Sequence, residues 1–365
     1  MKTITIQTDH SVYPVVLGED AIEKLDDIVN QLTPVVTSIL LIADETVYKL
    51  HKNYIASGLP ERIKRSTFLT PAGEKAKSFE VYQNAIGFAL EEGLDRHSLV
   101  IACGGGATGD LAGFVAATFM RGIRLIQLPT TILAHDSAVG GKVAINHPLG
   151  KNMVGSFHQP AAVIYDMNFL HSLPIRESRS GFAEVIKHAI IADPKWLDEM
   201  MADLDSLESL DNELLENSLK KGIEIKAAIV EKDEKELGIR AYLNFGHTYG
   251  HAIETWAGYG KWSHGESIMA GMVYSLYLSK KLKNLEFDLL RFVRWINKLG
   301  YTAQPPAESQ FDELLQLMLK DKKTVGKEVR FVLLEKIGKP VIQKIDTKEL
   351  AAADKMIRSA KGEIK

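Results

Sequence analysis

The stretch SLVIACGGGATGDLAGFVAATFM, residues 98–120, combines an apolar strand, a glycine-rich turn and an apolar helix. It contains the pattern GxGxxG at Gly104, Gly106 and Gly109. Glycines let backbone N–H groups approach a pyrophosphate, and the start of the following helix adds partial positive charge. The stretch therefore predicts a βα unit that binds a nucleotide, with a tight turn that binds nothing as the alternative.

The residues around this stretch alternate strand patterns with helical patterns. The amphipathic segment 74–92 predicts a helix that buries one face on a sheet. The amino terminus, MKTITIQTDHSVYPVVLG, alternates apolar and polar residues, which indicates a strand of the fold rather than an export signal. Together these patterns predict a parallel, Rossmann-like sheet. The expected strands are 4–6, 38–44, 65–69, 98–103, 123–128 and 162–166.

The pattern changes after Pro174, where helical periodicity replaces the alternation. Near the end, two strand patterns joined at Ile337 and Gly338 predict a hairpin, and a last helix begins at about 347. We therefore expect an α/β domain over 1–175 and an α-helical domain over 176–365, with the functional site in the cleft between them. The expected helices are 176–192, 211–235, 247–257, 265–283 and 286–298.

The composition limits the classes of function. The chain has 365 residues, 45% of them apolar, with 44 basic and 47 acidic side chains. This balance argues against the strong positive field that nucleic-acid binding requires. No apolar run reaches the roughly 18 residues of a membrane span. The single cysteine, Cys103, cannot form an intramolecular disulfide and is expected to be a buried thiol. We expect a cytoplasmic protein with neither a nucleic-acid nor a membrane partner.

The glycine turn departs from the usual dinucleotide fingerprint at one point. That fingerprint has an acidic residue about 20 residues on, which binds a ribose. The corresponding region here, RGIRLIQLPTT (121–131), has none. Asp44, at the end of the earlier strand SILLIAD, could supply the carboxylate instead.

A group of histidines and a glutamate predicts a metal site. His247 and His251 are four residues apart, so they share one face of a helix. His264 opens another helix in HGES, and Glu184 lies three residues before Lys187. Two imidazoles with one carboxylate and no thiolate form the ligand set of a catalytic zinc. Spacing alone does not decide which two histidines bind, and a polar cluster without metal is the alternative.

Several cations lie beside glycines or apolar faces. Any one of them is most simply a solvated surface charge. If they converged on one cleft, they would form a receptor for a polyanion such as a phosphorylated carboxylate. They are Lys142, Lys151, Lys187, Lys226, Arg240 and the lysines of the DKK segment at 321–323.

In combination these segments resemble the 3-dehydroquinate synthase family. The resemblance covers most of the chain and keeps the family's order of blocks. It implies an amino-terminal domain that binds NAD and a carboxy-terminal helical domain that carries metal and substrate groups. The blocks are PAGEKAKS (71–78), GGGATGD (104–110), FMRG (119–122), LPTTILAHDSAVGGKVAIN (128–146), GKNMVGSFHQP (150–160), FAEVIKHAI (182–190), LNFGHTYGHAIE (243–254), HGES (264–267) and DKKTVGKEVRFVLL (321–334).

The resemblance also implies roles for single residues. Glu184, His247 and His264 would hold Zn²⁺ or Co²⁺, which leaves His251 as a catalytic imidazole. Implied NAD contacts are Asp44, Glu74, Lys77, Gly105, Gly106, Asp110, Thr130, Thr131, Lys142, Lys151, Phe169 and Ser172. Implied substrate contacts are Asp136, Lys142, Asn152, Lys187, Lys226, Arg240, Asn244, His251 and Lys323 (or Lys322), with Arg121 reaching in from the partner of a homodimer.

The chain departs from the family pattern in two places. It reads LAHDSA where many members read LAxVDSS, one residue shorter before Asp136. Ser172 stands where threonine is more usual, which keeps a hydroxyl.

The implied reaction converts 3-deoxy-D-arabino-heptulosonate 7-phosphate to 3-dehydroquinate and phosphate, a step of the shikimate pathway. It proceeds by transient oxidation with NAD, loss of phosphate, re-reduction and aldol closure. The alternatives are another sugar-phosphate cyclase, making 2-deoxy-scyllo-inosose or a valiolone, and a metal-dependent polyol dehydrogenase. Arg240, Asn244 and the DKK segment favour a substrate with a carboxylate. A regulatory nucleotide-binding module would not need the histidines and glutamate.

Overall fold

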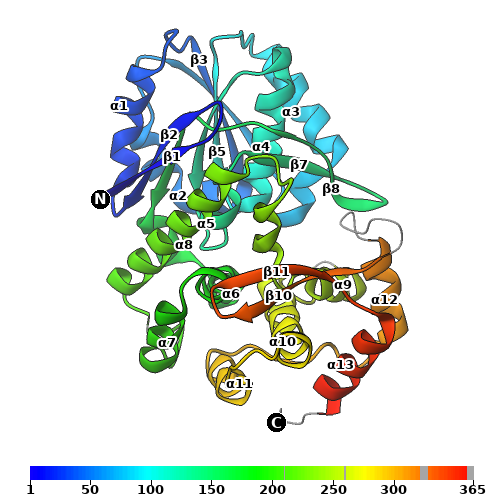
Figure 1. The fold of residues 1–365 in the computed structure, drawn as a ribbon. Helices are drawn as coiled ribbons and strands as arrows, with labels where there is room; N and C mark the ends of the chain where they lie inside the picture. The colour runs from blue at the N-terminus through cyan, green and yellow to red at the C-terminus, as the bar shows by residue number, and fades with distance from the viewer. Residues whose placement is uncertain (209, 259, 321–327, 360–365) are drawn as a thin grey trace. The chain divides into compact units, whose positions relative to one another are not determined.

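The computed structural model describes residues 1–208, 210–258, 260–320 and 328–359. It divides into two compact units. Unit 1 comprises Met1–Leu173 and Asn212–Lys235, and unit 2 comprises Pro174–Asp211 and Glu236–Lys365. Unit 1 is α/β and unit 2 is largely helical, as the sequence predicted (Figure 1).

The observed division differs from the predicted single boundary at residue 175, because the segment Asn212–Lys235 belongs to unit 1. Its helix α8 (Asn212–Lys232) packs on strand β1 (Lys2–Gln7) of unit 1. Ile223 of α8 is fully buried in an apolar cluster with side chains of β1. Amphipathic spacing predicts that this helix buries one face, but it does not say which unit receives that face.

One seven-stranded sheet forms the centre of unit 1. Its strands are β1, β2 (Val12–Gly18), β3 (Ser38–Asp44), β4 (Lys64–Thr70), β5 (Leu99–Gly104), β6 (Arg124–Pro129) and β9 (Ala162–Asp166). Their order is β1-β2-β9-β6-β5-β3-β4, and all neighbours are parallel except β1 and β2. Each strand predicted from the sequence is therefore present. β5 is buried along its whole length, as expected for a strand covered on both faces.

Helices cover both faces of this sheet. On β3, Leu41 packs in the apolar cluster on one face and Leu40 in the cluster on the other. Cys103 is buried in the cluster with Leu41, as predicted, and burial raises the pKa of its thiol. The helices are η1 (Ala21–Glu23), α1 (Lys24–Gln31) and α2 (Glu45–Gly58) on the first face, and α3 (Phe79–Glu91) and α4 (Gly106–Thr118) on the second. The predicted helix 74–92 is split into a short turn, η2 (Gly73–Lys77), and α3.

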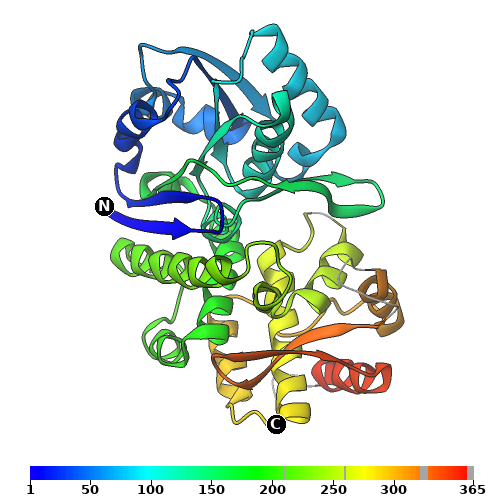
Figure 2. The same cartoon turned by 45° about the horizontal axis from the view of Figure 1, so that its top comes forward.

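A hairpin of β7 (Lys142–His147) and β8 (Gly150–Phe157) lies apart from the main sheet (Figure 2). It packs on α4, where Val143 and Ile145 join a buried cluster with Leu111. The sequence did not predict this hairpin, because no residue of β8 is buried and its sequence lacks apolar alternation. Unit 1 is completed by η3 (Phe119–Arg121), α5 (Ala134–Ser137) and η4 (Met167–Ser172).

Unit 2 is built around α10 (His264–Lys283), most of whose side chains are buried. The helices predicted at 176–192, 247–257, 265–283 and 286–298 are present, whereas the helices Pro194–Asp203 (α7) and Phe311–Lys320 (α12) are additional. The predicted hairpin joined at Ile337 and Gly338 is also present, as β10 (Arg330–Lys336) and β11 (Lys339–Lys344). The other elements are α6 (Ile175–Ala192), α7 (Pro194–Asp203), η5 (Ile239–Asn244), α9 (His247–Ala257), α11 (Leu289–Lys298), α12 (Phe311–Lys320) and α13 (Thr347–Ser359). In the described part of the chain, every helix is too short or too polar to cross a lipid bilayer.

Candidate active site

The carboxyl ends of β3 and β5 form a topological switch point in unit 1. After β3 the chain passes through α2 to β4, whereas after β5 it passes through α4 to β6 on the opposite side. Ligands of open α/β sheets bind where the connections diverge in this way. Asp44 ends β3 and Gly104 ends β5, and their preceding residues, Ala43 and Cys103, are partners in the sheet register.

The glycine turn at this point offers hydrogen-bond donors. Gly105 caps α4, and the helix begins at Gly106, so the first N–H groups of α4 have no acceptor within the helix. Thr130 and Thr131 follow the neighbouring strand, and the Thr130 amide donates to the Gly104 carbonyl at 3.0 Å. Both threonine hydroxyls are buried and have no hydrogen-bond partner among the described residues. A pocket at the turn is lined by Gly104, Gly105, Gly106, Gly109, Asp110, Gln127, Pro129, Ala134, Ser137 and Ala138.

Asp44 is held by backbone amides. Its Oδ1 accepts from the N–H groups of Thr46 (2.8 Å) and Val47 (3.2 Å) at the start of α2, and its Oδ2 accepts from Gly73 at 3.4 Å. A carboxylate has about four acceptor sites, so Asp44 keeps capacity for a ribose hydroxyl. The amide donors, the orphaned threonine hydroxyls and this carboxylate together fit a dinucleotide.

Lys77 is a buried cation beside the turn. Its Nζ lies 2.5 Å from Asp110 Oδ2 and donates to Asn152 Oδ1. Burial raises the pKa of Asp110, although Lys77 opposes the shift. Asn152, in β8, has a left-handed backbone with φ 56°, and its side-chain oxygen accepts from this cation.

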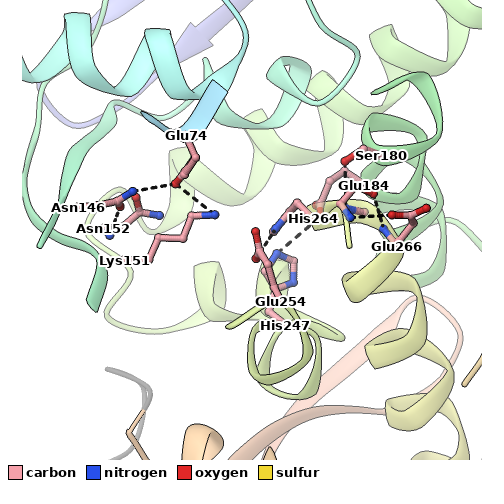
Figure 3. A network of polar contacts seen from close by, with 12 residues as sticks. Glu74, Asn146, Lys151, Asn152, Ser180, Glu184, His247, Glu254, His264 and Glu266 are labelled. Atoms are coloured by element: carbon pink, nitrogen blue, oxygen red, sulfur yellow. Dashed lines mark hydrogen bonds and ion pairs between the residues drawn. The ribbon is translucent and has the colours of Figure 1, made fainter. Parts of the chain in front are cut away.

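Glu74 links η2 to the β7–β8 hairpin (Figure 3). Its Oε1 lies 3.2 Å from Lys151 Nζ and accepts from Asn146 Nδ2 at 3.0 Å. Asn146 Oδ1 in turn accepts from the backbone N–H of Asn152 at 2.9 Å. Burial acts to raise the pKa of Glu74, but the charges of Lys77 and Lys151 outweigh it and lower the pKa. Four residues implied as cofactor contacts, Glu74, Lys77, Asp110 and Lys151, therefore belong to one network.

The remaining predicted residues of unit 1 lie in several places. Lys226 of α8 is buried, 3.3 Å from Asp136 Oδ1, and also donates to the Asp136 carbonyl. Lys142 is exposed at the start of β7. Arg121 is exposed in a turn where Met120, Arg121 and Gly122 all have positive φ.

Phe169 and Ser172 lie in η4, against α2. The Phe169 ring is buried and meets His51 edge-on, with ring centroids 5.2 Å apart. Ser172 Oγ lies 2.7 Å from His51 Nε2. His51 was not predicted from the sequence, because nothing in its local pattern distinguishes it from any other helical histidine.

In unit 2, the side chains of Glu184, His247 and His264 meet (Figure 3). Glu184 Oε1 lies 3.6 Å from His247 Nε2 and 3.5 Å from His264 Nε2. Ligands about 2.0–2.1 Å from a tetrahedral zinc lie roughly 3.3 Å from one another. The donor set and its spacing therefore fit such an ion. The second oxygen of Glu184 pairs with Lys187, which is as deeply buried as the glutamate.

Close backbone contacts bring together the three helices that carry Glu184, His247 and His264. Glu184 is on α6, His247 begins α9 and His264 begins α10. A Cβ added at Gly265 would lie 2.0 Å from the Ser180 carbonyl oxygen of α6. The absence of a side chain at this position therefore lets α10 approach α6 one turn from Glu184.

Each histidine of the cluster is oriented through its other ring nitrogen. His247 Nδ1 lies 3.1 Å from the Phe245 carbonyl, and His264 Nδ1 lies 3.2 Å from Glu254 Oε2. Burial acts to lower the pKa of His264, but Glu254 and Glu184 outweigh it and raise the pKa to about 9. Glu254 was not predicted, although it follows His251 by three residues on the same face of α9.

His251 lies beside the cluster. Its ring centroid is 5.2 Å from that of His247 and 5.9 Å from that of His264. Together with Glu254 and His264 it forms a second group of side chains within ligand distance of one another. Both groups include His264, so His251 and Glu254 lie next to Glu184, His247 and His264.

Two further predicted residues, Arg240 and Asn244, belong to the described part of unit 2. Arg240 is buried in η5, and Asn244 Nδ2 donates to Glu236 Oε1 at 2.8 Å. Glu236, which was not predicted, has a left-handed backbone with φ 58°. Lys322 and Lys323 lie outside the described residues.

Solved structures share this architecture. A structure of 2-deoxy-scyllo-inosose synthase complexed with carbaglucose-6-phosphate, NAD⁺ and Co²⁺ is 26% identical, with a TM-score of 0.87 over 98% of this chain and 99% of that one. The 2-epi-5-epi-valiolone synthase of Streptomyces hygroscopicus subsp. jinggangensis 5008, with NAD⁺ and Zn²⁺ bound, shares the fold at 23% identity, with a TM-score of 0.84 over 97% and 98% of the two chains. The fold is that of the sugar-phosphate cyclases.

Sequence comparison narrows this class. Family models for the N-terminal and C-terminal parts of 3-dehydroquinate synthase match residues 67–180 and 181–324. The 3-dehydroquinate synthase of Listeria monocytogenes serotype 4b (strain CLIP80459) is 49% identical over 95% of each chain. That of Geobacillus thermodenitrificans (strain NG80-2) is 47% identical over 99% of this chain and 100% of its own. The chain belongs to the 3-dehydroquinate synthase family of enzymes, as the sequence blocks predicted.

Proposed function

We propose that this enzyme converts 3-deoxy-D-arabino-heptulosonate 7-phosphate to 3-dehydroquinate and phosphate, as a carbon–oxygen lyase of the shikimate pathway. The observation that carries the proposal is the 49% identity over 95% of the chain with a curated 3-dehydroquinate synthase. The 2-deoxy-scyllo-inosose synthase, which has the same fold, is only 26% identical. We further propose that the protein works in the cytoplasm as a homodimer, with Arg121 of one protomer contacting substrate bound by the other.

In this proposal, residues of unit 1 bind NAD. The N–H groups of the glycine turn at Gly105 and Gly106 and the hydroxyls of Thr130 and Thr131 would donate to phosphate oxygens. Asp44 would accept from a ribose hydroxyl. The other proposed contacts are Glu74, Lys77, Asp110, Lys142, Lys151, Phe169 and Ser172.

Glu184, His247 and His264 would hold Zn²⁺, or Co²⁺ in its place, because their donor atoms already lie at ligand spacing. When bound, NAD supplies a reversible hydride transfer and the metal polarises the hydroxyl that is oxidised. Glu184 lowers the charge of the site, and Lys187 neutralises its second oxygen.

The remaining groups would position the substrate and move its protons. Lys142, Asn152, Lys226 and Arg240 would hold the phosphate by charge and hydrogen bonds. Because that phosphate can itself take up the proton released during elimination, these residues need not include a strong base. Asp136, Lys187, Asn244 and Lys323 are the other proposed substrate contacts.

His251 is the proposed proton relay. Its ring lies beside the two histidines of the cluster without belonging to the triad of proposed ligands. An imidazole titrates near neutral pH, so it can accept the proton of the hydroxyl under oxidation and return it later.

One incubation tests the proposal. Purified protein is mixed with the heptulosonate phosphate, NAD and Zn²⁺, and both phosphate and the carbocyclic product are measured, with a chelator-treated control. We expect both products in equal amounts, with no net NADH. Accumulation of absorbance at 340 nm with glycerol, and no phosphate release, would instead identify a polyol dehydrogenase. Turnover of glucose 6-phosphate but not of the heptulosonate would identify a 2-deoxy-scyllo-inosose synthase.

A further inference from the structure

His264 uses both of its ring nitrogens. Nε2 faces Glu184 Oε1 at 3.5 Å, on the side of the proposed metal, and Nδ1 faces Glu254 Oε2 at 3.2 Å. The Glu254 side chain is only 9% exposed, so its contact with the imidazole is largely shielded from water. His264 therefore lies between two carboxylates, one for each ring nitrogen.

A carboxylate that accepts a hydrogen bond from Nδ1–H fixes the tautomer of a neutral imidazole. The lone pair is then on Nε2, the nitrogen that faces Glu184. The same contact fixes the ring plane and makes the imidazole a stronger ligand. His247 is oriented differently, by the neutral carbonyl of Phe245. The carboxylate of Glu254 thus gives His264 an electrostatic contribution that His247 lacks.

The position of Glu254 is set by the backbone rather than by a flexible loop. Glu254 is on α9 with His247 and His251, at offsets of seven and three residues that share one helical face. A Cβ added at Gly271 of α10 would lie 1.9 Å from the Gly246 carbonyl just before α9. This close packing of the two helices holds Glu254 opposite His264.

We propose that Glu254 is a positioning residue that orients and polarises His264 for metal binding. The inference rests on the proposed function, because it takes the Glu184, His247 and His264 cluster as the metal site. It predicts that Glu254 controls the affinity for the ion without contacting the ion itself.

The test compares Glu254→Ala and Glu254→Gln in the full-length protein after removal of metal. Co²⁺ affinity is measured by chelator competition, and the visible spectrum of the bound Co²⁺ reports its geometry. We expect Glu254→Ala to weaken affinity by about 10- to 100-fold and to alter the spectrum. Glu254→Gln keeps an acceptor oxygen but not the charge, so its loss of affinity should be smaller.

Glu313→Gln is the matched control. Glu313 Oε2 accepts from the indole N–H of Trp256 at 2.8 Å, and Trp256 is on α9, as Glu254 is. Glu313 contacts neither His247 nor His264. This variant should bind Co²⁺ like the unsubstituted protein. Thermal unfolding of each metal-free variant shows whether a change in affinity comes from a loss of folded protein.

Two results would overturn the inference. In one, Glu254→Ala binds Co²⁺ with unchanged affinity and spectrum. In the other, it only lowers the unfolding temperature while the folded fraction binds normally, which would show a structural role. Failure of the unsubstituted protein to bind Co²⁺ would refute the metal site of the proposed function, and this inference with it. Co²⁺ binding by the unsubstituted protein therefore tests the proposed metal site, and the comparison with Glu254→Ala tests the role of Glu254.

Discussion

Replacing Gly265 by alanine tests whether the close approach of α6 and α10 builds the histidine and glutamate cluster. The new Cβ would lie 2.0 Å from the Ser180 carbonyl oxygen and 2.5 Å from the Ser180 Cα. Real Cβ atoms essentially never come within 3.0 Å of another heavy atom in this way. Because a backbone oxygen cannot rotate away and the interior is close-packed, α10 must move by about 1 Å from α6.

This movement has two costs. Overpacking of a close-packed interior destabilises by about 1–3 kcal/mol, and the methyl group recovers at most about 0.8 kcal/mol through its own burial. The movement also separates His264 Nε2 from Glu184 Oε1, now 3.5 Å apart. Metal sites tolerate deviations of only about 0.2 Å in ligand distance. A shift of about 1 Å should therefore weaken metal binding by at least about 100-fold.

The assay separates these effects. Urea unfolding of the metal-free protein gives the change in stability, and Co²⁺ competition under native conditions gives the change in affinity. Gly87→Ala in α3 is the control, because a Cβ added there would have no neighbouring heavy atom within 4 Å. It should stabilise the protein by about 0.5–1 kcal/mol and leave metal binding unchanged. If Gly265→Ala also left both quantities unchanged, the cluster would not depend on this contact.

Three further predictions concern other parts of the molecule. His251→Ala should keep the metal but lose about 100-fold in turnover, and full activity would reject its role as a proton relay. Glu74 has a pKa lowered by two lysines against the effect of burial, so its stabilising charge is lost only as the pH falls through that lowered value. The difference in urea-unfolding free energy between the unsubstituted protein and Glu74→Gln should be constant above about pH 5 and shrink in acid; a gap that widened in acid would contradict this sign. Asp354→Asn removes the buried carboxylate that accepts from Tyr249 and Arg358, and should cost about 3 kcal/mol in the same assay, whereas a loss below about 0.5 kcal/mol would show that the network is dispensable.

The sheet of unit 1 was predictable because helices cover both of its faces. Neighbouring residues such as Leu40 and Leu41 are then both buried, which produces unbroken apolar runs in the sequence. The β7–β8 hairpin was not predictable in this way, since no residue of β8 is buried. The position of α8 was missed for a different reason. Its apolar face is visible in the sequence, but the strands that cover that face lie about 200 residues earlier.

The candidate site was predictable in its residue types but not in its assembly. The spacing of His247 and His251 places both on one helical face. No local pattern relates them to Glu184, whose contact with His264 is a tertiary one. Glu254 lies in the same helical motif as His247 and His251. Its proposed role depends on its contact with His264, which is on another helix, so the motif alone could not reveal that role.

Glycines decide whether the proposed metal ligands can meet. Gly265 lies against the Ser180 carbonyl of α6, and Gly271 lies against the Gly246 carbonyl before α9. In the sequence both look like ordinary helical glycines, which weaken a helix by about 1 kcal/mol relative to alanine. A related chain that kept Glu184, His247 and His264 but replaced these glycines would match the ligand pattern and lose the ligand geometry. A sequence signature for this site therefore has to include the glycines as well as the ligands.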